Sequence, residues 1–299
     1  MKWQGRRRSS NIEDHRGQRS SGQGIGGFNP ALLTPLIRLL FSKVGLFIVG
    51  AFLIITLIMG QNPLSLISQL LSGGALETET LQDYTPTAKD EELADFSATI
   101  LGDTEVIWNK LLNNYREPTL VLFTGSVSSA CGSASSSTGP FYCPGDEKLY
   151  IDLSFFYDME HRLNAPGDFA QAYVIAHEVG HHIQKITGIT DKMQRLRGQV
   201  TQTEYNKYSI RLELQADFLA GVWAHHSQKM SGMMETGDLE EAMNAANAIG
   251  DDRLQKQSSG RVVPDSFTHG TSQQRMRWFK KGFETGDLSQ GDTFSATSL

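Results

Sequence analysis

An uncharged apolar run of seventeen residues, VGLFIVGAFLIITLIMG at 44–60, divides this 299-residue chain into two parts. At 1.5 Å per residue, a helix of this length reaches about 25 Å, close to the hydrocarbon thickness of a bilayer. The apolar residues of 36–41 lengthen the run, and about forty residues precede it, more than a cleavable signal peptide has there. We therefore expect one uncleaved transmembrane helix over residues 36–60, with a buried core helix as the alternative.

The charge of the chain divides at the same place. Residues 1–43 contain eight Lys or Arg and two acidic residues, although the whole chain has 27 basic and 33 acidic residues. Because positive flanks stay in the cytoplasm, we expect a bacterial inner-membrane protein with a cytoplasmic N-terminus and a periplasmic domain. Residues 1–35 are rich in Gly, Ser and Arg, lack an apolar period and are predicted to be a disordered basic tail. Membrane lipid is its expected partner, and nucleic acid is not.

The pattern of the outer part predicts an α+β domain. Residues 61–90 are predicted to be a linker and residues 91–299 a single domain. Strands are expected at 119–125 and 148–156, where apolar and polar residues alternate or β-branched residues gather. Helices are expected from residue 91, with Gly102 and Asp103 as a candidate break, and then at 154–163, 168–187, 203–229, 238–257 and 271–285. A small sheet followed by several helices is typical of α+β domains.

Cys131 and Cys143 lie in the Gly/Ser/Pro-rich stretch VSSACGSASSSTGPFYCP. On the oxidising side of a membrane they are expected to form a disulfide. Two metal ligands or two free thiols are the alternatives. A closed structural zinc site is not expected, since no second Cys or His pair at zinc-finger spacing accompanies them.

The motif AHEVGHH at 176–182 carries the strongest chemical signal. His177 and His181 are four residues apart and share one face of a helix, so both imidazoles can bind one metal ion. Zinc with an open position lowers the pKa of its bound water to about 7, and Glu178 is placed to take the proton of that water. His182 is off this face and is expected to pack against other residues.

A third ligand is expected from LELQADFLAG at 212–221, where Glu213 and Asp217 share a helical face within an apolar stretch. Unpaired carboxylates are costly there, which favours a cation beside them. Glu213 is the expected ligand and Asp217 the expected acceptor for the second N–H of a liganding histidine. The competing third ligands are His225, His226 and His269.

HEVGHH followed by ELQAD resembles the glutamate-liganded zinc peptidases, and ELQAD is similar to the second motif of membrane endopeptidases of the CAAX-processing and heat-shock kind. Nearly the whole chain, including CGSASSSTGPFYCPGDEKLYIDLSFF and FTHGTSQQRMRWF, resembles the bacterial neutral zinc metallopeptidase family. The resemblance implies a mainly helical, gluzincin-like zincin domain with one Zn²⁺. It also implies His177, His181 and Glu213 as ligands, Glu178 as the catalytic residue and Asp217 behind the ligands.

Two further assignments concern the late segment and the cleft. His269 lies in a turn before a helix that Thr271 or Ser272 caps, and it can donate to the oxyanion of a tetrahedral intermediate. Arg275 can bind an acidic partner such as Asp217 or a substrate carboxylate. By analogy, LYIDLSFF is the expected edge strand that pairs with substrate.

We therefore predict a membrane-anchored zinc metallopeptidase, an endopeptidase that cleaves peptides or proteins of the cell envelope. A non-enzymatic zinc-binding envelope scaffold is the alternative, and a hydrolase of lipids or glycans is a further one.

Overall fold

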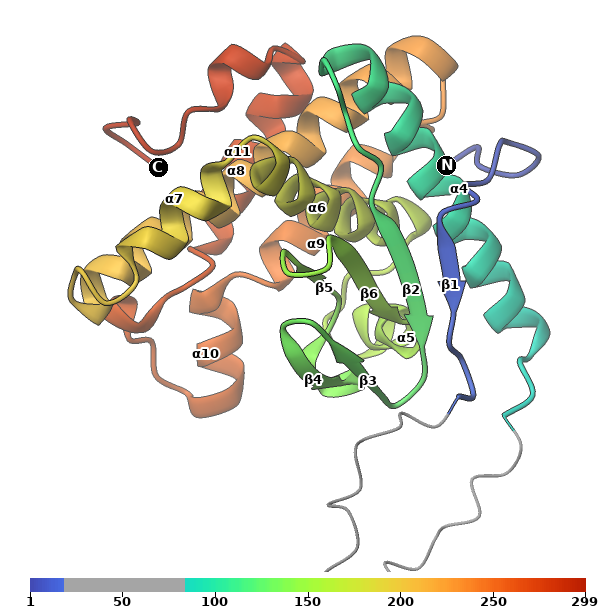
Figure 1. Cartoon of the computed structure of the whole chain (residues 1–299), viewed down its shortest axis with the longest axis horizontal. Coiled ribbons are helices and arrows are strands. Elements are labelled where there is room, and N and C mark those ends of the chain that lie inside the picture. Colours follow the sequence, from blue (N-terminus) through green and yellow to red (C-terminus); the bar gives the residue numbers. More distant parts are fainter. Residues whose placement is uncertain (19–83) are drawn as a thin grey trace, which may run out of the picture. The chain divides into compact units, whose positions relative to one another are not determined.

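The structure is a computed structural model that describes residues 1–18 and 84–299. Residues 1–18 and 85–299 belong to one compact unit. The predicted transmembrane helix at 36–60 and most of the predicted linker at 61–90 lie outside the described residues. Within the part of the chain that the structure describes, no helix is long and apolar enough to cross a bilayer. The described residues form an α+β fold, mainly helical with a small sheet, as the sequence predicted (Figure 1).

The helices and strands follow the predicted order, with some additions. The helices are α4 (Ala88–Leu111), α5 (Ser154–His161), α6 (Asp168–Ile186), α7 (Ile189–Leu196), α8 (Gln202–Ser231), α9 (Asp238–Ala248), α10 (Asp251–Ser259) and α11 (Ser272–Thr285). The strands are β1 (Ile12–Asp14), β2 (Thr119–Phe123), β3 (Ser126–Ser129), β4 (Gly132–Ser135), β5 (Phe141–Cys143) and β6 (Lys148–Asp152). Three 3-10 turns complete the fold: η1 (Ser136–Thr138), η2 (Pro264–Ser266) and η3 (Leu288–Gly291).

Three helix predictions need correction. The predicted helix at 238–257 is two helices, α9 and α10, because the chain turns at Gly250, where Ser272 packs against it. Helix α7 was not predicted. Helix α4 is continuous through Gly102. A Cβ added at this position would lie only 2.9 Å from the backbone nitrogen of Ser9. Gly102 is therefore a close-approach site for the N-terminal segment and not a helix break.

The main sheet has the order β1-β2-β6-β5, with β1, β2 and β6 parallel and β5 antiparallel to β6 (Figure 1). Strands β3 and β4 form a separate hairpin. Strand β6 is thus interior, and the prediction that LYIDLSFF is the edge strand is wrong. The edge strand on this side is β5, and the predicted disulfide between Cys131 and Cys143 is confirmed, attaching the β3–β4 turn to β5.

The prediction of a disordered tail over 1–35 is wrong for residues 1–18. Strand β1 pairs with β2, with Ile12 opposite Leu120, and these residues belong to the same unit as 85–299. The segment is polar and has no apolar period, so its order comes from tertiary contacts that a local pattern does not contain. Residues 19–35 lie outside the described residues.

Helix α6 occupies the centre of the unit. It packs against β5 and β6 on the sheet side and against α4, α8 and α9 among the helices, while α11 packs along α8. Its buried residues join the main core with those of the sheet and of α8, among them Ile100, Leu122, Ile151, Phe169, Ile175, Phe218 and Trp223. The helix that carries the HEVGHH motif is therefore held on several sides.

Candidate metal centre

Helix α6 presents both motif histidines toward α8. It begins at Asp168, directly after Gly167 at the N-cap position. The helix ends before Gly188, which has a left-handed backbone. Between these ends most residues are buried, and a Cβ at Gly180 would lie 3.0 Å from the backbone of Ala216. This close contact lies between the two histidines on α6 and the two acids on α8.

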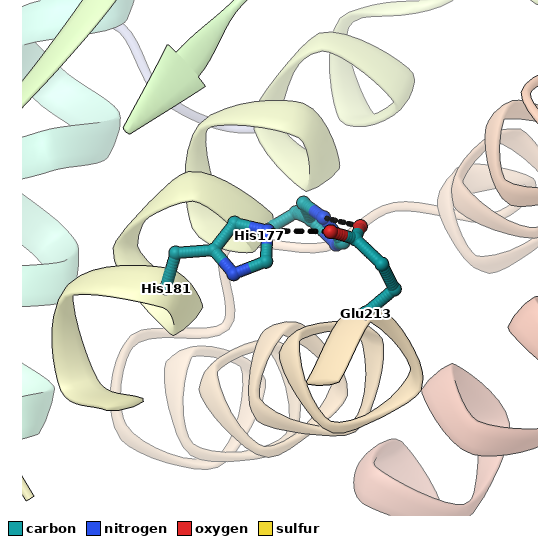
Figure 2. Close-up of side chains that lie close together, drawn as sticks. All are labelled: His177, His181 and Glu213. Carbon is teal, nitrogen blue, oxygen red and sulfur yellow. Dashed lines mark hydrogen bonds and ion pairs between the residues drawn. The ribbon is translucent and has the colours of Figure 1, made fainter. Parts of the chain in front are cut away.

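The side chains of His177, His181 and Glu213 converge on one point (Figure 2). The Nε2 atom of His177 is 3.3 Å from one carboxylate oxygen of Glu213, and the Nε2 atom of His181 is 3.5 Å from the other. Two ligand atoms of a tetrahedral zinc ion, each about 2.0–2.1 Å from the metal, lie about 3.4 Å apart. The nitrogen and oxygen donors therefore fit a zinc ion held between them.

Both histidines are oriented by hydrogen bonds on their other nitrogen. The Nδ1 atom of His177 lies 2.8 Å from Oδ1 of Asp217, which can only accept when ionised. The Nδ1 atom of His181 lies 2.9 Å from the Gln184 amide oxygen, and the Gln184 amide nitrogen donates to the Leu212 carbonyl. Each Nδ1 therefore carries a proton, which leaves Nε2 as the nitrogen that faces the ligand position.

Asp217 is completely buried. Arg275 forms an ion pair with its carboxylate, in addition to the contact with His177. Arg275 donates from Nε and Nη2 to the two carboxylate oxygens at 2.9 Å each, and the Tyr173 hydroxyl donates to Oδ1 at 2.5 Å. Burial alone would raise the pKa of Asp217, but Arg275 and His177 outweigh it and lower the pKa to about 2. The predicted contact between Arg275 and Asp217 is confirmed, and the carboxylate stays ionised as an acceptor for His177.

The three converging side chains also shift one another's pKa. Burial alone would lower the pKa of His177, yet Asp217 and Glu213 raise it to about 9. Burial likewise opposes the charge on Glu213, but the histidines hold the pKa of this carboxyl well below its ordinary value. The site therefore attracts one or more cations, either protons or a metal ion.

Glu178 is the acidic residue of the HEVGHH motif. Only 8% of the residue is exposed, and among the described residues its carboxylate makes no hydrogen bond or ion pair. It is close enough to His181 to contribute to raising the pKa of that histidine. A carboxylate without a partner beside a metal site is free to exchange a proton with a water molecule.

His182 supports the helix, as predicted. Its Nε2 donates to the Arg116 carbonyl at 2.6 Å, and its Nδ1 accepts from the Tyr142 hydroxyl at 3.1 Å. Burial lowers the pKa of His182, which keeps the imidazole neutral. The residue thus attaches α6 to β5 and to the chain after α4.

His269 lies in the turn before α11, which Thr271 caps as expected. Its Nδ1 is 3.1 Å from Oδ1 of Asp251, and Oδ2 of Asp251 accepts from the backbone N–H groups of Thr268, His269 and Gly270. The Asp251 hydrogen bond raises the pKa of His269, and Glu213 adds to this shift. The imidazole is therefore oriented by Asp251 and lies within electrostatic reach of a proposed metal ligand.

The competing ligands are placed elsewhere. His225 and His226 contact the carbonyl oxygens of Phe283 and Gly286 at the C-terminal end of α11. A second group of acids, Asp168, Asp238 and Glu241, is also close enough to hold an ion, but the Met1 amino nitrogen lies 2.8 Å from Asp168 there. A cation of the chain itself thus occupies that position.

Sequence reasoning missed three residues of the site. Tyr173 lies four residues before His177 and Gln184 three residues after His181, so helical spacing would have placed both on the ligand side. Asp251 has no comparable signal, because it reaches His269 only through the packing of α10 against the turn before α11.

The chain is similar to known proteins over most of its length. It is 49% identical over 298 residues to "Uncharacterized protein YpfJ" of Escherichia coli K12, which covers 98% of this chain and 99% of the relative. It is 42% identical over 208 residues to "Uncharacterized protein Rv2575" of Mycobacterium tuberculosis H37Rv, covering 66% and 69%. No solved structure matches it. Residues 1–294 match the family described as "Putative neutral zinc metallopeptidase", and the chain therefore belongs to that family.

Proposed function

We propose that this protein is a zinc-dependent endopeptidase of gluzincin-like architecture, with one Zn²⁺ held by His177, His181 and Glu213. The observation that carries the proposal is the convergence of two oriented Nε2 atoms and a carboxylate beside the unengaged carboxylate of Glu178. A structural zinc site is usually closed by four protein ligands, whereas a catalytic site has three and an open position. Within the described residues, the group has three.

Each side chain of the site has a separate role in the proposed peptide hydrolysis. Zinc, when bound, supplies a Lewis acid that polarises the peptide carbonyl and acidifies a water molecule. Glu178 accepts the proton of the attacking water and donates it to the leaving nitrogen. Asp217 and Gln184 hold the two imidazoles in the ligand tautomer, and Arg275 keeps Asp217 ionised.

His269 is proposed to stabilise the oxyanion that forms as water attacks. Its Nδ1 is engaged by Asp251, so its Nε2–H is the group left to donate to the developing charge. The raised pKa of His269 increases the fraction of imidazolium, which is the stronger donor. Asp251 is then a positioning residue, because it acts on the reaction through His269.

The substrate is proposed to be a peptide or protein of the cell envelope. The disulfide between Cys131 and Cys143 supports an oxidising compartment, where such bonds persist. The apolar run within 36–60 supports membrane association through lipid contact.

Replacement of Glu178 by glutamine tests the proposal. The variant should bind one zinc ion per chain as the wild type does, since Glu178 is not one of the three proposed ligands, but peptide hydrolysis should fall by about a hundredfold or more. Metal content by mass spectrometry and cleavage of a fluorogenic peptide library measure the two properties. Glu160→Gln, at an exposed glutamate of α5, is the matched control and should retain activity.

Two results would decide against the peptidase. If Glu178→Gln cleaves peptides at the wild-type rate, the general-base role is wrong. If the zinc-loaded wild type cleaves no peptide and is not labelled by a hydroxamate, the non-enzymatic zinc scaffold is the better explanation. Cleavage of envelope lipids or glycans in place of peptides would favour a different hydrolase with the same centre.

A further inference from the structure

The N-terminal segment, residues 1–18, is an integral part of the unit that carries the metal centre. Strand β1 pairs with β2 in parallel register over its whole length, and Lys148 of β6 binds Glu13 at 2.7 Å. The Ser9 backbone N–H donates to the Ala98 carbonyl of α4 at 2.9 Å. The segment thus supplies an edge strand to the sheet and crosses α4 where Gly102 leaves room for it.

A buried acid of α4 anchors the same segment. Glu105 is fully buried, and its carboxylate accepts from the Ser9 hydroxyl and from the Asn11 amide at 2.8 Å. Arg7 lies 2.8 Å from the other carboxylate oxygen. A buried carboxylate is costly unless it is paired, so Glu105 needs this polar segment in place.

The two places where the chain leaves and re-enters this unit lie side by side. Arg16, just before residue 19, donates to the Asp90 carbonyl and to the Glu91 carboxylate at 3.1 Å each. Both partners belong to the first turn of α4, a few residues after residue 83. The described residues on the two sides of 19–83 are therefore close together in one folded unit.

We propose that residues 1–18 and the metal centre lie on the same side of the membrane, because both belong to one folded unit. A single crossing leaves the preceding and following residues on opposite sides, where β1 and β2 could not pair. The predicted arrangement, a cytoplasmic N-terminus with a periplasmic domain, conflicts with the described unit.

Cysteine labelling of the full chain in cells tests this placement without any need for peptidase activity. Both native cysteines are in the disulfide, so an added cysteine is the one free thiol of the chain. Ser10→Cys and Gln257→Cys replace exposed residues of the N-terminal segment and of α10. A membrane-impermeant maleimide added to spheroplasts should label both variants or neither, because both positions lie on the same side of the membrane. After the membrane is permeabilised, both variants should react. Labelling of one variant with protection of the other overturns the proposal.

Trypsin digestion of the purified full chain tests whether the segment is docked. Arg7 and Arg8 should be cut slowly in the native wild type, because β1 and Glu105 hold the segment in place. Gly102→Ala places a Cβ 2.9 Å from the Ser9 nitrogen and should speed cleavage there by about tenfold, whereas Val106→Ala, at an exposed position of α4, should not. Wild-type cleavage at Arg8 as fast as in the denatured chain would overturn the docked arrangement.

Discussion

At the scale of single residues, the centre is organised by carboxylates that are not metal ligands. Asp217 and Asp251 each accept from the Nδ1 side of a histidine, and each is held ionised, with its pKa lowered despite burial. Asp217 receives two charged donors of Arg275 in addition. A buried charge pair of this kind costs about 3–5 kcal/mol when one partner is removed, so Arg275 is needed for stability as well as for the orientation of His177.

Asp251→Asn should lower kcat by about tenfold with little change in KM or zinc content, because the amide still fits the turn but no longer supports the imidazolium of His269. It should also move the alkaline limb of the pH–rate profile to lower pH. Asp251 raises the pKa of His269, so the variant His269 loses its proton at a lower pH than the wild-type residue.

A double-mutant cycle checks that Asp251 acts through His269. Asp251→Asn should add little to the loss already caused by His269→Ala, since the residue it positions is then absent. Full additivity of the two losses would contradict the positioning role. Circular dichroism melting of all three variants separates a loss of stability from a loss of function.

At the scale of elements, the metal centre is a contact between two helices. Helix α6 contributes His177 and His181, and α8 contributes Glu213 and Asp217. The helices are in close contact where Gly180 meets Ala216, between these pairs. Because a glycine there sets the spacing of the helices, it also sets the distance between the imidazoles and the carboxylate.

Gly180→Ala should separate the two helices, since the new Cβ would lie 3.0 Å from the Cα and carbonyl oxygen of Ala216, which are backbone atoms that cannot rotate away. A displacement of about 1 Å at a catalytic centre costs about a hundredfold in rate, and overpacking costs about 1–3 kcal/mol of stability. Zinc affinity, peptide hydrolysis and thermal melting measure the three effects.

Gln171→Ala, on the partly exposed side of α6, is the matched control for this substitution. It should leave zinc affinity and activity unchanged. Unaltered zinc affinity in Gly180→Ala would show that the helix spacing does not determine the ligand geometry.

At the scale of the whole molecule, the donor group is built on elements that pack into one core. The ligands come from helices anchored in a core that includes the sheet and α11, and both imidazoles are oriented by hydrogen bonds to protein groups. Removal of zinc is therefore expected to abolish activity while leaving the fold in place. Zinc at about 1,000 times its Kd should still stabilise the fold by about 4 kcal/mol.

Zinc binding should release protons at neutral pH. Without metal, Asp217 and Glu213 raise the pKa of His177 to about 9, so this imidazole is protonated at pH 7 and must lose its proton to bind zinc. Zinc affinity should consequently rise as the pH increases toward 9. Calorimetric titration with zinc in buffers of different ionisation enthalpy measures the released protons, and an identical heat in every buffer would contradict the expectation.

The local sequence was sufficient for the metal helix and its partners. His177, Glu178 and His181 share a spacing that places two imidazoles on one side of any helix, and Glu213 and Asp217 repeat that spacing in an apolar stretch. Apolar periodicity likewise located α6, α8 and α11 within a few residues. These features depend on neighbours along the chain, and the sequence therefore contains them directly.

Only the tertiary structure decided which distant segments meet. The polar residues 1–18 have no pattern that predicts a strand, and their order comes from pairing with β2 and from the buried Glu105 on α4. Asp251 reaches His269, and β5 takes the sheet edge that β6 was expected to occupy, for the same reason. Contacts between residues far apart in sequence depend on how the elements pack. A local pattern determines each element, but packing determines which faces are brought together.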